Sequence, residues 1–153
     1  IRAAGHGQQV AIMQFIKGTW KTGETEAFKR FPEIDHFVSG DGFTWNTQDL
    51  DEDTASALNG WKKTCELIDA CRGDKPAYNL IVLDELNIAL RYDYLDAKEV
   101  AEVLKSKPEM LNIIVTGRSA KQELIDIADT VTDMTMVKHA FEAGIRAQKG
   151  IEF

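Results

Sequence analysis

Cysteine, proline and long apolar runs are scarce in this sequence. Its 153 residues include two cysteines and three prolines. Cys65 and Cys71 are too far apart for a CxxC redox pair and have no metal-ligand spacing. Two free thiols are typical of a reducing compartment, so we expect a cytoplasmic location. No apolar stretch is long enough to span a membrane and no signal peptide is visible, so the sequence predicts no membrane partner.

Positive charge is scarce as well. The formal net charge is -7, and no run of five or more basic residues occurs. A polyanion is repelled on average by such a chain, which excludes nucleic acid as the main partner. The three histidines are far apart and show no HxxxH-type spacing, so the sequence contains no histidine-based metal motif.

Apolar, β-branched stretches cover residues 9–18, 79–85 and 111–118. Such stretches are typical of strands buried on both faces of a parallel sheet. Residues 33–39 alternate apolar and polar side chains and indicate another short strand. Because helical patterns separate these strands, the sequence predicts an α/β fold with a mainly parallel sheet flanked by helices. The chain length suits a single domain over residues 1–153.

Helical spacing is clearest after residue 50. The acids of Asp51–Asp53 fit the first turn of a helix, where they complement the helix dipole. The apolar stripe predicted to face the core consists of Leu58, Trp61, Cys65 and Ile68. Asp96 and Ser119 are predicted N-caps of two further helices. Residues 130–137 indicate one more strand.

The beginning of the sequence is unusual, since it has no initiating Met. Residues 1–4 have the pattern of a last helical turn, and Gly5 or Gly7 fits the position that ends a helix. We therefore expect the chain to be incomplete at its N-terminus.

The acids Asp84 and Glu85 directly follow one of the apolar strands. In an open parallel sheet, ligands bind at the carboxyl ends of the strands. Four apolar residues followed by acids resemble a Walker B strand, which holds Mg²⁺ beside nucleotide phosphates. The alternative is an acid that caps the strand and bonds a neighbouring loop. The GxxxxGK[ST] loop that accompanies a Walker B strand is absent from this sequence.

Arg118 follows another of these strands. There its guanidinium group is placed to bind a phosphate or carboxylate in bidentate fashion. The alternative is a surface arginine paired with an acid.

Phe43 and Trp45 lie in a polar, glycine-containing loop, where large aromatic side chains are unusual. In an extended segment the two rings share one face. They form either a wall for a large, flat ligand or an extension of the protein's own core.

Several motifs occur together in a specific order. They are "VAIMQFIKGTW", "GFTWNTQD", "LIVLDELNIALRYDYL", "IIVTGR" and "ADTVTDMTMVKHAFEAGIRAQKGIEF". In this order they closely resemble the P-loop ATP:corrinoid adenosyltransferases, and the resemblance covers essentially the whole chain.

The resemblance implies a RecA-like P-loop fold that here lacks its first strand and its P-loop. It implies a cytoplasmic homodimer that moves the 5′-deoxyadenosyl group of ATP to Co(I) of a corrinoid and releases triphosphate, with a flavoprotein-type electron donor as a further partner. It implies that Glu85, with Asp84 beside it, binds Mg²⁺, and that Arg2 lies at the end of the P-loop helix. It implies that Phe43 and Trp45 face the corrinoid and displace its lower axial ligand.

Two departures and two alternatives accompany this resemblance. Without the P-loop, the chain as given is expected to bind ATP poorly and to have little or no activity. The connection at residues 72–78 is also longer than is usual in the family. The alternatives are a RecA-like P-loop ATPase of another function and a non-catalytic corrinoid-binding module.

Overall fold

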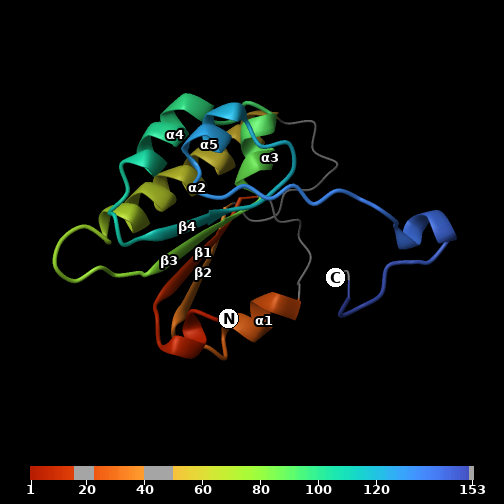
Figure 1. Cartoon of the computed structure of the whole chain (residues 1–153), viewed down its shortest axis with the longest axis horizontal. Coiled ribbons are helices and arrows are strands. Elements are labelled where there is room, and N and C mark those ends of the chain that lie inside the picture. The colour runs from red at the N-terminus through yellow and green to blue at the C-terminus, as the bar shows by residue number, and fades with distance from the viewer. Residues whose placement is uncertain (16–22, 40–49, 152–153) are drawn as a thin grey trace.

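A four-stranded parallel sheet forms the centre of the protein (Figure 1). The computed structural model describes residues 1–15, 23–39 and 50–151. The strands are β1 (Val10–Gln14), β2 (Ile34–Val38), β3 (Leu80–Asp84) and β4 (Asn112–Val115). They lie in the order β2-β1-β3-β4, and every neighbouring pair is parallel. The predicted α/β class and parallel sheet are confirmed.

The register of the strands aligns their carboxyl ends. Gln14, the last residue of β1, lies opposite Val38 of β2 on one side and opposite Asp84 of β3 on the other. Backbone bonds continue past the strand ends, because Phe15 N–H donates to Asp84 C=O and Ser39 N–H to Gln14 C=O. The polar residues that end these strands therefore lie at one edge of the sheet.

Four of the helices in the described ranges cover one face of the sheet (Figure 1). The elements on this face are α2 (Leu50–Asp69), α3 (Leu86–Arg91), α4 (Ala97–Lys105) and α5 (Gln122–Ile127). The short helix α1 (Gly23–Phe28) and the 3-10 turn η1 (Ala4–His6) lie on the other side. None of the helices in the described ranges is long and apolar enough to cross a membrane.

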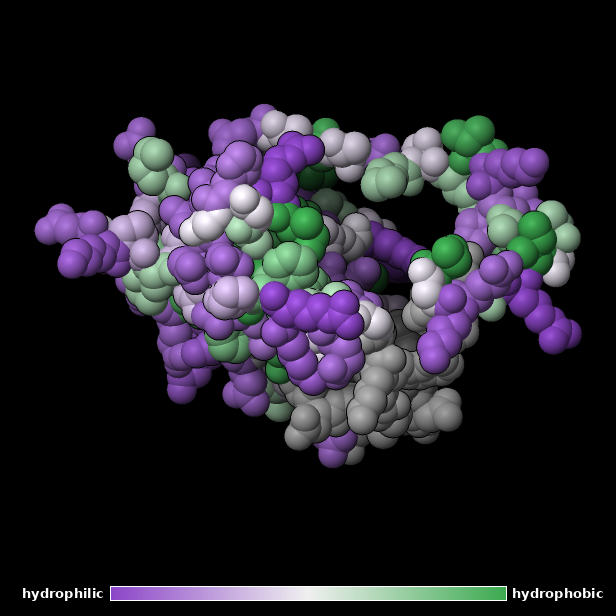
Figure 2. All heavy atoms as spheres, turned by 90° about the horizontal axis from the view of Figure 1, so that it is seen from below, coloured by the Kyte–Doolittle hydropathy of each residue, from purple (hydrophilic) through white to green (hydrophobic). Residues whose placement is uncertain are grey.

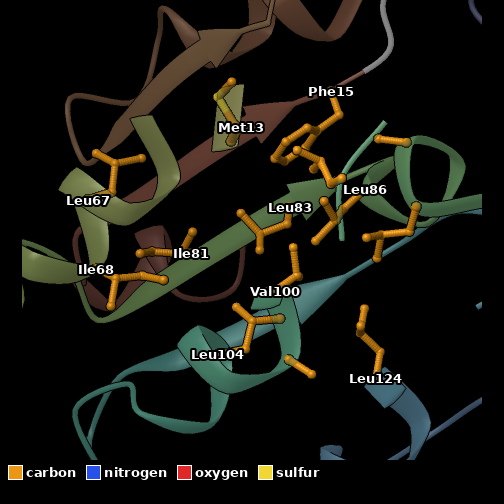
Figure 3. Close-up of a cluster of buried hydrophobic side chains, with 14 of the residues drawn as sticks. Met13, Phe15, Leu67, Ile68, Ile81, Leu83, Leu86, Val100, Leu104 and Leu124 are labelled. Atoms are coloured by element: carbon orange, nitrogen blue, oxygen red, sulfur yellow. The ribbon is translucent and has the colours of Figure 1, made fainter. Parts of the chain in front are cut away.

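The main core lies between the sheet and helices α2, α3, α4 and α5, as Figure 3 shows. Successive strand residues point to opposite faces. Met13 and Phe15 of the β1 segment accordingly enter the main core, whereas Val10 enters a smaller cluster on the other face with Ala4 and Ile34. The N-cap of α4 is formed as predicted, because the Asp96 carboxylate accepts from the backbone N–H groups of residues 98 and 99.

The predicted core stripe of α2 is wrong in part. Ile68 is buried, but Leu58 is 52% exposed, and Trp61 and Cys65 are only partly buried. The most deeply buried positions are mainly small residues with the same helical spacing, namely Ala57, Gly60 and Thr64. Small side chains let the helix approach the sheet closely, which the apolar pattern alone does not reveal.

Three other predictions also fail. Ser119 has a left-handed backbone (φ 58°) and caps no helix, since α5 begins at Gln122 after Lys121. Residues 130–137 form no strand and their side chains are exposed. β4 is a half-exposed edge strand of the described sheet, with Ile114 at 49% exposure, where a strand buried on both faces was expected.

The close approach of α2 makes Gly60 a sensitive position. A Cβ atom added there would lie 2.8 Å from Met13 Cε and 2.8 Å from both Cβ and Oγ of Ser39. Although alanine favours a helix by about 1 kcal/mol over glycine, overpacking costs typically about 1–3 kcal/mol. We therefore expect Gly60→Ala to lower the free energy of unfolding, measured by urea titration, by about 1–2 kcal/mol.

Gly23→Ala is the matched control, because an added Cβ in α1 meets no atom within 4 Å. We expect its free energy of unfolding to stay within about 0.5 kcal/mol of the unmodified protein. An undiminished stability of Gly60→Ala would contradict the close contact between α2 and Ser39.

Candidate functional site

The carboxyl edge of the sheet brings four polar residues together. They are Gln14 at the end of β1, Asp84 and Glu85 at the end of β3, and Thr116 directly after β4. Each follows or ends an apolar strand, so the buried core beneath positions the strand ends while the polar side chains meet above it. The predicted acidic pair therefore lies where ligands bind in parallel sheets.

Asp84 is held from both sides. Its Oδ2 accepts a hydrogen bond from Gln14 Nε2 at 3.1 Å, and its Oδ1 accepts one from Thr116 Oγ1 at 2.7 Å. Because both carboxylate oxygens have a partner on a neighbouring strand segment, the plane of the carboxylate is fixed. A carboxylate oxygen has more than one lone pair, so both oxygens can still accept a further bond from a ligand.

Glu85 has a strained backbone. Its φ of 61° places it in the left-handed region, which a residue with a side chain adopts only where the surroundings enforce it. Its N–H donates to Thr116 Oγ1 at 3.1 Å, and α3 starts at the next residue. This turn moves the chain from β3 into α3 and leaves the Glu85 carboxylate at the sheet edge.

Burial raises the pKa of the Glu85 carboxyl above its ordinary value of 4.5. The neighbouring Asp84 carboxylate raises this pKa further, whereas the Arg118 guanidinium lowers it. Two acids in contact favour binding of a cation, because a cation relieves their mutual repulsion. The positive charge of Arg118 thus acts on Glu85 and partly offsets the repulsion from Asp84.

Gly117 lets the chain pass close to the start of α3. Its φ is 125°, and an added Cβ would lie 2.9 Å from Asn87 Cβ. The backbone N–H of Asn87 donates to Thr116 C=O at 3.2 Å. Asn87 Oδ1 is buried and has no hydrogen-bond partner in the described part of the chain. An unpaired buried oxygen is costly, and a catalytic role, a bound water or ion, or stored strain can account for one.

The predicted site residues fall into three groups. Asp84 and Glu85 lie at the carboxyl edge, and Arg118, which is exposed, follows β4 close enough for its charge to lower the pKa of Glu85. Arg2 is exposed and precedes η1, which leads into the amino end of β1, so the structure does not bring it to this edge. Phe43 and Trp45 lie outside the described residues.

The described residues on either side of range 40–49 are held by side-chain hydrogen bonds. Ser39 follows β2, and its Oγ donates to Ser56 C=O of α2 at 2.7 Å. On the same helix, Asp53 accepts a hydrogen bond from Tyr94 at 3.3 Å.

Sequence reasoning missed Gln14, His36 and Thr116. His36 of β2 lies with its Nε2 2.7 Å from Gln14 Oε1. Gln14 ends an apolar strand, Thr116 directly follows one, and His36 lies in a strand of mixed polarity. The meaning of each depends on which residue of the next strand lies opposite.

A magnesium ion is compatible with the donors present. Mg²⁺ in nucleotide sites takes one or two carboxylates and completes its octahedral shell with phosphate oxygens and water. Asp84 and Glu85 supply two carboxylates. No group of three or more His, Cys, Asp or Glu that could hold a metal occurs among the residues described. The donor set therefore fits a metal shared with a phosphate-bearing substrate better than an all-protein metal centre.

These features define a parallel α/β domain of the RecA-like kind, with an acidic pair at the carboxyl edge of its sheet. The family model described as ATP:corrinoid adenosyltransferase BtuR/CobO/CobP matches residues 1–153. The chain belongs to this family.

Relatives support the same assignment. The corrinoid adenosyltransferase of Pseudomonas aeruginosa is 50% identical over 99% of this chain and 73% of its own length. That of a Sinorhizobium species is 48% identical over 99% of this chain and 70% of its own length. Corrinoid adenosyltransferase CobA of Salmonella typhimurium is 40% identical over 99% of this chain and 74% of its own length. A RecA-like ATPase of another function is not favoured.

The electrostatics of the acidic pair can be tested by carbon-13 NMR titration of the Glu85 carboxyl. We expect Arg118→Gln to raise the pKa of Glu85 and Asp84→Asn to lower it, since the first removes an attractive charge and the second a repulsive one. The elevated pKa means that Glu85 contributes most to stability when protonated, and this contribution is lost as pH rises through the folded-state pKa.

Lys121→Gln is the control for Arg118, because Lys121 forms its ion pair with Asp93 at 2.8 Å. An equal change of the Glu85 pKa in Lys121→Gln and Arg118→Gln would show that Arg118 has no specific place at the edge.

Proposed function

We propose that this protein transfers the 5′-deoxyadenosyl group of ATP to the cobalt of a reduced corrinoid. The observation that carries the proposal is the match of the whole chain to the ATP:corrinoid adenosyltransferase family. Asp84 and Glu85 repel a bare triphosphate, so the acidic edge supports the proposal as a site for the Mg²⁺ that accompanies ATP.

The reaction is a displacement at carbon. The Co(I) centre of the substrate donates an electron pair to C5′ of the ribose, so that a Co–C bond forms while the C5′–O bond breaks. Cobalt is thereby oxidised to Co(III), and the triphosphate leaves with the electrons of the broken bond. The protein must position C5′ against cobalt and stabilise the negative charge on the departing triphosphate.

The acidic pair and Arg118 are placed at the triphosphate end. Glu85, with Asp84 fixed beside it, would hold Mg²⁺, which when bound neutralises charge on the triphosphate. Arg118 offers a guanidinium group near the same carboxylates, where it can bind phosphate oxygens directly. The assignment is supported by the position of Asp84 and Glu85 at the carboxyl edge and by the influence of the Arg118 charge on the pKa of Glu85. The part of Arg2 in ATP binding stays a prediction.

Phe43 and Trp45 are assigned to the corrinoid end. An axial donor on cobalt raises the energy of the orbital that must accept an electron, so its removal makes Co(II) easier to reduce. Apolar rings at that position would displace the donor and exclude water. The assignment is supported by the aromatic pair within an otherwise polar stretch.

We also propose a cytoplasmic homodimer that receives electrons from a flavoprotein-type donor. Two free thiols, Cys65 and Cys71, are in keeping with a reducing compartment. Apolar side chains gather along the C-terminal segment, which stands apart from the body of the protein (Figure 2). The exposed large apolar residues of this segment are Val131, Met134, Met136, Val137, Phe141, Ile145 and Ile151. A second copy of the chain would cover such a surface.

An anaerobic assay tests the activity. The chain, together with any residues encoded before Ile1, is supplied with Mg²⁺-ATP, corrinoid and a strong reductant. We expect the spectrum of a light-sensitive Co–C bond and release of triphosphate. Hydrolysis of ATP to ADP without this spectrum would instead support an ATPase.

Substitutions at the corrinoid end and at the triphosphate end are expected to slow different steps of the reaction. Trp45→Ala should slow reduction of Co(II) far more than transfer from preformed Co(I), because the ring acts on the axial ligand. Trp45→Phe retains an apolar ring and is the control that should preserve most of the reduction rate. Equal losses in both steps for Trp45→Ala would refute the axial-ligand role.

Glu85→Gln should show the opposite pattern. Transfer from preformed Co(I) is expected to fall at least about tenfold, because a ligand at the triphosphate end is lost, while reduction of Co(II) stays unchanged. Single-turnover kinetics with chemically prepared Co(I) measure the first step, and Co(II) spectra measure the second. An unchanged rate of transfer would remove Glu85 from the site.

A further inference from the structure

Gln14 is a buried amide in the middle of the sheet. Its side chain is only 9% exposed, although the residues before and after it in the β1 segment belong to the apolar core. Both ends of the amide have a partner. Nε2 donates to Asp84 Oδ2 at 3.1 Å, and Oε1 lies 2.7 Å from Nε2 of His36.

His36, Gln14 and Asp84 form a row of hydrogen-bonded side chains across three strands. The chemistry of the partners fixes the direction of each bond in this row. A carboxylate only accepts, so the NH₂ group of Gln14 must face Asp84 and the amide oxygen must face His36. The oxygen in turn requires a donor, so His36 Nε2 carries a hydrogen. The row thus runs from β2 through β1 to β3, with each residue determining the orientation of the next.

His36 is itself held in place. Its ring lies against the ring of Phe28 at a centroid distance of 5.2 Å and an interplanar angle of 57°. Phe28 ends α1, so the helix on the other side of the sheet restricts rotation of the imidazole. Without a hydrogen on His36 Nε2, Gln14 would lie between two acceptors, and its single NH₂ group could not face both of them.

Filling space in the core does not explain why these side chains are polar. An apolar side chain of similar length, such as methionine, would occupy the position of Gln14 without the cost of burying an amide. A buried polar row is favoured where it determines one geometry among several. Here the group whose geometry it determines is Asp84, whose other oxygen is already held by Thr116.

We propose that Gln14 and His36 are positioning residues for Asp84, which fix the carboxylate that faces the metal and triphosphate of ATP. This inference rests on the proposed function. The two residues touch neither substrate, and they act by holding the Asp84 oxygens in one orientation.

NMR on the unmodified protein tests the row without any assay of activity. We expect the nitrogen-15 shifts of the neutral His36 ring to report the Nε2–H form, and the Gln14 side-chain amide protons to exchange slowly with water. In His36→Leu the Gln14 amide protons should exchange faster. A neutral His36 ring protonated at Nδ1 would overturn the proposal, because no donor would then face Gln14.

Binding of Mn²⁺-ATP, followed by electron paramagnetic resonance with Mn²⁺ in place of Mg²⁺, tests the consequence. The protein includes any residues encoded before Ile1. We expect Gln14→Met and His36→Leu to weaken this binding about tenfold, as is typical for residues that orient a ligand. His36→Gln should restore most of it, since a glutamine amide can also donate to Gln14.

Tyr78→Phe is the matched control. It removes a hydrogen bond of 2.7 Å to Asp35, also on β2, but near the amino half of the strand. If Gln14→Met binds Mn²⁺-ATP as tightly as Tyr78→Phe does, the positioning role is refuted. The outcome for the proposed function is separate, because only the formation of the Co–C bond decides adenosyl transfer, whereas NMR and Mn²⁺ binding decide the role of Gln14 and His36.

Discussion

The parallel pairing of β1 with β3 is the constraint on which the rest of the structure depends. It places Gln14 opposite Asp84, and the bond from Phe15 N–H to Asp84 C=O extends the pairing beyond the strands. The apolar side chains directly beneath, Phe15 and Leu83, are completely buried. A shift of the register by one residue would turn both side-chain sets to the wrong faces. The packing of the core therefore fixes the positions of the strand ends that form the polar edge.

The same edge contains the features that are least favourable for stability. Glu85 has a left-handed backbone, and burial and Asp84 raise its pKa. Asn87 Oδ1 is buried without a partner in the described part of the chain. Backbone strain persists where the surrounding structure is strong enough to hold it, and it clusters at sites of function. An unsatisfied buried polar atom is rare in native structures, and a functional role is one explanation for it. Their concentration beside β3 agrees with a site whose charge balance is completed by substrate.

Much of the fold could be predicted, because a strand buried on both faces leaves an apolar run that needs no knowledge of its neighbours. The predictions were wrong where the structure of a residue depends on the residues packed against it. Leu58 and Ala57 fit the same helical spacing, but only the small residue suits the close contact of α2 with the sheet. Serine is a common N-cap residue, but Ser119 lies in the turn after Gly117 and has a left-handed backbone there. In the site, Asp84 and Glu85 could be identified because two acids follow an apolar strand. Gln14 and His36 could not, because only the strand register shows that they lie next to each other and to Asp84.

The positions of the strand ends also relate the two halves of the proposed reaction. The chain leaves β2 at Ser39 and reaches Glu85 at the end of β3, and these strands are separated by β1 alone. Neighbouring strands are about 4.8 Å apart, so the two exits lie roughly 10 Å from each other. In ATP the reacting C5′ is bound through oxygen to the α-phosphate, so its carbon and its triphosphate are necessarily close. In the proposed function, the triphosphate is held near the end of β3, whereas Phe43 and Trp45, which follow β2 in the sequence, act on the axial position of cobalt and not on C5′. If the two tasks belong to different residues in this way, a loss at either end affects a different step.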